Sequence, residues 1–139
     1  MKKLLIDLVA IILITSNIWA QEQQPEKHRM VILADMGNEP DEEQQMVHML
    51  MCSNEFDVVG LIAVTGKFLN PNSNKPEKQK LYPELFTKLI EGYEKVYTNL
   101  KIHAPGYPEP GYLRSLVMIG QKGYGMDDVG EGKSSPGSE

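Results

Sequence analysis

Cysteine is almost absent from this chain, since Cys52 is the only one among 139 residues. A single cysteine excludes an intrachain disulfide, so the fold must be held by its hydrophobic core. The preceding residues, Met49, Leu50 and Met51, are apolar, and this setting predicts a buried, unreactive thiol.

Basic residues are in the minority, with 14 Lys and Arg against 19 Asp and Glu and a net charge of −5. Proteins that bind nucleic acid through phosphate contacts need the opposite balance. We therefore expect no nucleic-acid partner.

Long apolar runs are scarce, and the longest stands at the N-terminus. Lys2 and Lys3 precede an apolar stretch that ends near Ala20, which predicts a secretory signal peptide over residues 1–20. The alternative is a membrane anchor, but the run is shorter than the roughly 20 residues of a spanning helix. We expect a secreted or periplasmic protein with no membrane attachment after cleavage, and a polar spacer over residues 21–28.

The pattern that follows indicates an α/β fold. Met30–Ala34 and Asp57–Thr65 are apolar runs typical of strands covered on both faces, and Asp41–Ser53 between them has helical spacing with Pro40 in its first turn. Strand, helix and strand in this order form a βαβ unit with parallel strands. Ligands of such units bind beyond the carboxyl ends of the strands.

The rest of the chain predicts few further elements. Lys67–Lys80 reads as a loop, Pro83–Leu100 as an amphipathic helix, Lys101–His103 as the start of a third strand, and Tyr112–Ile119 as a short helix. Residues 121–139 predict no regular structure. Because two or three strands make a small core, we interpret residues 29–139 as the N-terminal portion of a larger domain.

Five acidic residues crowd into nine positions after the first strand. One interpretation is helix capping, worth about 0.3–1 kcal/mol for each charge near the helix N-terminus. It does not explain an acidic residue at the strand end, nor Asn38 before the proline. The other interpretation is a hard cation, because Ca²⁺ takes six to eight oxygen ligands. The sequence leaves both open for the group Asp35, Glu39, Asp41, Glu42 and Glu43.

The stretch "VILADMGNEPDEEQQMVHMLMCSNEFDVVGLIAVTG" resembles the opening of nucleoside hydrolases. It is closer to the secreted cellulose-binding, nucleoside hydrolase-like proteins, whose first turn tends to read Asn-Glu-Pro-Asp-Asp where this chain has Asn38-Glu39-Pro40-Asp41-Glu42. The resemblance continues through "LFTKLIEGYEKVYTNLKIHAPGYP" and "KGYGMDDVGEGKSSPGS". It implies a parallel-sheet, Rossmann-like nucleoside hydrolase-type fold, here truncated after its first strands and helices.

The resemblance also implies roles for individual residues. Asp35, Asp41 and Glu42 match positions that hold Ca²⁺, with Asp41 also the catalytic carboxylate, while Asn38, Glu39 and Lys67 match substrate-binding positions. The implied activity of a complete domain is Ca²⁺-dependent hydrolysis of an N- or O-glycosidic bond, with a carbohydrate or nucleoside ligand.

Two departures from the motif favour the alternative of a non-catalytic carbohydrate-binding protein. Gly37 stands where nucleoside hydrolases usually have another aspartate, and Glu42 is one methylene longer than the second aspartate of the pair. Three tyrosines lie among Pro and Gly residues, and they are Tyr107, Tyr112 and Tyr124. Such tyrosines either stack on sugar rings or cover the edge of the hydrophobic core. A site role is open for His103, Ser134 and Ser135.

Overall fold

The fold is built on a three-stranded parallel sheet. The computed structural model describes residues 26–139, so the predicted signal peptide and most of the predicted spacer lie outside the described residues. The strands are β1 (His28–Ala34), β2 (Phe56–Ala63) and β3 (Val117–Ile119), in the order β1-β2-β3. The α-helices are α2 (Asp41–Met51), α3 (Pro83–His103) and α4 (Pro110–Ser115). The predicted parallel βαβ unit and α/β class are confirmed.

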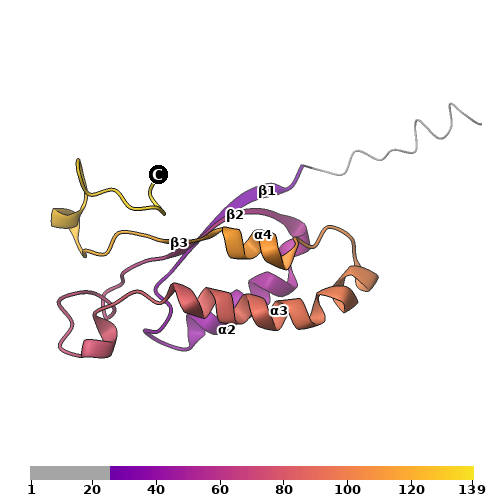
Figure 1. Ribbon diagram of the computed structural model, residues 1–139, viewed down its shortest axis with the longest axis horizontal. Helices are drawn as coiled ribbons and strands as arrows, with labels where there is room; N and C mark the ends of the chain where they lie inside the picture. The colour runs from indigo at the N-terminus through magenta and orange to yellow at the C-terminus, as the bar shows by residue number, and fades with distance from the viewer. Residues whose placement is uncertain (1–25) are drawn as a thin grey trace, which may run out of the picture.

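Helices α2 and α3 pack together against one face of the sheet (Figure 1). Between the sheet and these helices lies the core, to which α2 contributes Met46 and Leu50 and β2 contributes Val58 and Leu61. The side chains of Phe86, Ile90 and Leu113 are fully buried in it. Within residues 26–139, no helix is both long enough and apolar enough to span a membrane.

The opposite face of β1 is open, so the prediction of a strand covered on both faces is wrong for this element. Val31 is 53% exposed and Leu33 64% exposed. On β2 the same face is closed by the C-terminal segment, because a Cβ added at Gly137 would lie 2.5 Å from Cγ2 of Ile62. No described helix covers Val31 and Leu33, because α2 and α3 both pack on the other face.

The third strand lies elsewhere than predicted. Lys101–His103 forms the last turn of α3, where positive charges suit the helix C-terminus, and the strand is β3 at Val117–Ile119. The predicted helix Tyr112–Ile119 therefore divides between α4 and β3. Pro110 can occupy the first turn of α4, and the β-branched Val117 and Ile119 suit the pairing with β2.

Cys52 is exposed, so the predicted buried thiol is also wrong. It follows the last residue of α2, whose buried face carries Met46 and Leu50 and leaves Met51 44% exposed. Ser53 is buried instead, and its hydroxyl donates to the carbonyl oxygen of Leu50 at 2.8 Å. The apolar run before Cys52 thus does not reach the core at every position.

The turn after β1 depends on a glycine. Gly37 has φ +92°, and an added Cβ would lie 2.6 Å from Cδ2 of Tyr82. We expect Gly37→Ala to lower the free energy of unfolding by about 1–2 kcal/mol, because an L side chain is strained at this φ and meets the ring.

Gly92→Ala is the matched control, since a Cβ on this exposed residue of α3 meets nothing within 4 Å. This change should raise the free energy of unfolding by about 0.5–1 kcal/mol. Urea unfolding of both variants measures the two effects. If Gly37→Ala did not lower the free energy of unfolding, the strained turn would be contradicted.

Candidate functional site

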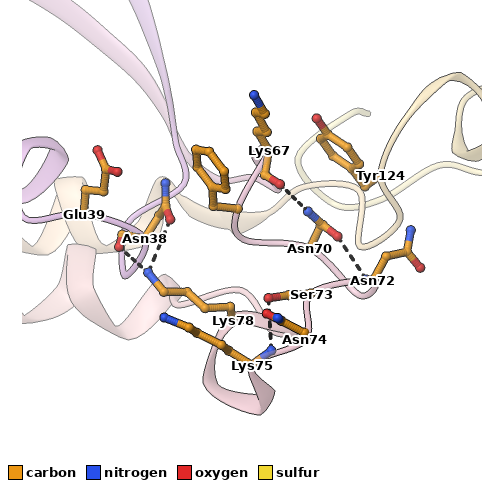
Figure 2. A pocket seen from close by; sticks show the side chains of 11 residues that line it. Asn38, Glu39, Lys67, Asn70, Asn72, Ser73, Asn74, Lys75, Lys78 and Tyr124 are labelled. Carbon is orange, nitrogen blue, oxygen red and sulfur yellow. Dashed lines mark hydrogen bonds between the residues drawn. The ribbon is translucent and has the colours of Figure 1, made fainter.

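Three loops meet beyond the carboxyl ends of the strands and form a cavity of about 680 Å³ (Figure 2). The turn after β1 contributes Asn38 and Glu39. The loop after β2 contributes most of the lining, and the segment after β3 contributes Tyr124. The residues from the loop after β2 are Lys67, Phe68, Asn70, Asn72, Ser73, Asn74, Lys75 and Lys78.

The loop after β2 is fixed by Asn70, which is 6% exposed. Its side-chain amide donates to the carbonyl oxygens of Gly66 at 3.0 Å and Lys67 at 2.8 Å, and its side-chain oxygen accepts from the backbone N–H of Asn72 at 3.0 Å. Leu69 beside it is buried, while Phe68 is 56% exposed. The loop therefore holds Asn70 and Leu69 inside and presents Phe68 at the cavity.

Lys78 joins this loop to the turn after β1. Its ammonium group donates to the carbonyl oxygen of Gly37 at 3.1 Å. It also donates to the backbone oxygen of Asn38 and to the Asn38 side-chain oxygen, the latter at 3.3 Å (Figure 2). The same Asn38 side chain donates to the Asp35 carboxylate at 3.5 Å. Asn38 thus connects the cavity wall to the acidic turn.

The structure divides the site residues taken from the sequence into two groups. Asn38, Glu39 and Lys67 all line the cavity, although they come from two different loops. Asp35 and Glu42 face one another beside it, and Asp41 is exposed at the first position of α2.

Glu42 is a perturbed carboxyl group in the acidic turn. Burial raises its pKa above the ordinary value of 4.5. Its own backbone N–H partly opposes this, and hydrogen bonding and charge from Asp35 raise the pKa further. Its Oε2 is buried and has no hydrogen-bond partner among the described residues. The Asp35 carboxylate lies against the backbone of Gly66, where any Cβ would overlap it.

These features fit part of a hard-cation site. Two carboxylates that face each other, one with an unpaired buried oxygen, are stabilised by a proton or by a cation. Within residues 26–139, however, no three His, Cys, Asp or Glu side chains converge closely enough to hold a metal ion. Any further ligands of a hard cation here would therefore be carbonyl or amide oxygens, water, or groups outside the described residues.

Several lining residues were missed by sequence reasoning. Lys75, Lys78 and the asparagines of the loop were singled out only as a segment rich in Lys and Asn, because no spacing rule places a loop side chain. Of the tyrosines, only Tyr124 lines the cavity; the hydroxyls of Tyr107 and Tyr112 donate to the backbone oxygens of Met51 and Val58.

The remaining candidates lie outside the cavity lining. His103 is exposed at the end of α3, and Ser135 is hydrogen-bonded to Ser138. Ser134 donates to Glu139.

Comparison with known proteins agrees with this architecture. Residues 29–139 match the family described as "Cellulose-binding Sde182, nucleoside hydrolase-like domain". The chain belongs to this family. The comparison with curated proteins gave no match.

A solved structure is also similar, that of a nucleoside hydrolase-related hypothetical protein from Saccharophagus degradans that is associated with carbohydrate metabolism. The two share 39% identity with a TM-score of 0.67, over 80% of this chain and 25% of that one. The chain thus spans about a quarter of the length of this relative.

In this nucleoside hydrolase-like domain, the structure gives a reason for one departure from the nucleoside hydrolase motif, the glycine at position 37. The motif usually has an aspartate there, but the backbone at Gly37 has φ +92° and the Tyr82 ring covers it. The turn is therefore built around the glycine and the ring, and its carboxylates come from Asp35 and α2.

The carboxylate pair makes stability depend on pH. A carboxyl whose pKa is raised on folding loses its contribution as pH rises from its unfolded pKa, 4.5, through its folded pKa. With a chelator present to remove bound cations, the melting temperature should therefore fall as the pH rises over this range. Glu42→Gln should remove the part of this fall that is due to Glu42. At pH 7 we expect Glu42→Gln to melt about 1–3 °C higher, since partial solvation keeps the effect below about 1 kcal/mol.

Glu43→Gln is the control, because it removes the next carboxylate of α2 without touching the pair. Thermal melts of the three proteins from pH 4 to pH 8 measure the difference. A lower melting temperature for Glu42→Gln at pH 7 would contradict the unfavourable ionisation.

Proposed function

We propose that the cavity is a carbohydrate-binding site. The observation that carries the proposal is the pairing of exposed aromatic rings with amide side chains around one hollow. Phe68 is 56% exposed and Tyr124 is 42% exposed, and both line it together with Asn38, Asn72 and Asn74. Aromatic faces pack on the apolar faces of sugar rings, and amides pair with their hydroxyls.

The comparisons support this proposal. The family is described as cellulose-binding, and the solved relative as associated with carbohydrate metabolism. Binding at the carboxyl ends of parallel strands is also the general rule for α/β sheets. We extend the proposal to export from the cytoplasm, on the pattern of residues 1–20.

Removal of either ring should weaken binding of a cello-oligosaccharide. We expect Phe68→Ala and Tyr124→Ala each to raise the dissociation constant about three- to tenfold, in line with 0.5–1.5 kcal/mol for an aromatic contact. Isothermal titration calorimetry on the full protein measures the change.

Met126→Ala is the matched control, since Met126 is 84% exposed on the same segment as Tyr124 and does not line the cavity. Its affinity should equal that of the wild type. If both aromatic variants also bind like the wild type, the sugar does not bind in this cavity.

A second candidate function is Ca²⁺-dependent hydrolysis of a glycosidic bond, favoured by the unpaired Oε2 of Glu42 beside Asp35. Asp35, Asp41 and Glu42 would hold the ion, together with ligands from elsewhere in a complete domain. A bound Ca²⁺ would lower the pKa of a water molecule. In this proposal Asp41, which is exposed at the start of α2, would accept a proton, and Asn38 and Glu39 would orient the ligand.

The cation proposal distinguishes two neighbouring carboxylates. We expect Asp41→Ala to weaken Ca²⁺ binding at least about tenfold, a loss typical even of groups that only support a metal ligand. Glu43→Ala should have little effect, because Glu43 lies beyond the pair on α2. Calorimetry with Ca²⁺ measures both, and equal effects would show that these charges act only through the helix dipole.

A further inference from the structure

The cavity is basic although the chain is acidic. Three lysines line it, Lys67, Lys75 and Lys78, against the single carboxylate of Glu39, while the whole chain has a net charge of −5. None of the ion pairs within residues 26–139 includes any of these lysines. The nearby Lys80, which does not line the cavity, does pair with Glu84, at 3.9 Å.

The three ammonium groups have different surroundings. Lys78 is partly buried, and its hydrogen bonds go to carbonyl and amide oxygens, which leave its positive charge uncancelled. Lys67 and Lys75 are exposed, and the ammonium group of Lys67 lies 5.2 Å from the centroid of the Phe68 ring. A positive charge therefore stands beside a ring that we have proposed as a stacking surface.

A neutral glucan would make no use of these charges. Lysines clustered in a cavity create a local positive potential that concentrates anions and weakens as salt is added. The amide groups of Asn72 and Asn74 line the same cavity and can form hydrogen bonds with the hydroxyls of the same ligand. The charges and the amides together match a sugar ring that carries an anionic substituent.

We propose that the cavity selects carbohydrates with an anionic group on the sugar ring over neutral ones of the same length. This inference rests on the proposed carbohydrate-binding function. A uronate carboxylate and a sulfate ester are the two sources of such a group. Because lysine acts as a point charge, it accepts either, and the experiment includes both.

The test measures affinity by calorimetry on the full protein with three tetrasaccharides: cellotetraose, sulfated cellotetraose and tetragalacturonate. At low salt at least one charged probe should bind about tenfold more tightly than cellotetraose. The advantage should shrink as the salt concentration rises from about 0.05 M to 0.5 M, where exposed charges are largely screened.

Variants then assign the preference to the cavity. Lys67→Gln and Lys75→Gln should each weaken the favoured charged probe about two- to fivefold, the range expected for an exposed ion pair, and weaken cellotetraose less than that. Lys95→Gln, an exposed lysine of α3 outside the cavity lining, should leave all three affinities unchanged. Lys78 is not substituted, because its hydrogen bonds hold the turn after β1.

The outcomes separate the two proposals. If cellotetraose binds as tightly as both charged probes, or if the preference persists in both lysine variants, the charge selection is overturned and carbohydrate binding stands. If no probe binds, both proposals fail. A charge preference that is lost in the lysine variants supports the inference. The charged probe that binds more tightly then identifies the anionic group.

Discussion

The ammonium group of Lys78 holds together two loops whose contact points lie about 40 residues apart in the chain. Carbonyl oxygens of Gly37 and Asn38 point toward one place at the turn, and a donor with positive charge satisfies them there. The loop after β2 can therefore lie across the carboxyl ends of the strands. The cavity wall, the position of Asn38 and the approach of the basic loop to the acidic turn all depend on this contact.

The contact also places opposite charges on the two sides of Asn38. Lys78 lies on one side, and the carboxylates of Asp35 and Glu42 lie on the other. The carboxylate pair favours a proton or a cation, whereas we propose that the cavity favours an anion. One edge of the sheet thus offers adjacent positions of opposite preference, which suits a ligand with both hydroxyl and anionic groups.

The sequence predicted the elements whose pattern is local. The β1–α2–β2 unit follows from two apolar runs and a helical spacing between them, and parallel pairing then brings Asn38, Glu39 and Lys67 to one edge. The third strand could not be found in this way, because Val117–Ile119 is only three residues long, is separated from α4 by one residue, and pairs with the distant segment Leu61–Ala63.

Properties that depend on distant parts of the chain were also beyond the sequence. The exposure of Val31, Leu33 and Cys52 reflects which face the helices cover, and an apolar run does not specify that. Likewise, Lys78 resembled the other lysines of its loop, and its contacts with Gly37 and Asn38 distinguish it.

The most direct test of the proposed carbohydrate site is an NMR titration of the full protein with a tetrasaccharide that it binds. The account expects backbone amide shifts to concentrate at Asn38 and Glu39, in the loop from Lys67 to Lys78, and at Tyr124, with little change on the outer surface of α2 and α3. Shifts that concentrate in the apolar groove between α2 and α3, near Val47 and Val96, would contradict it.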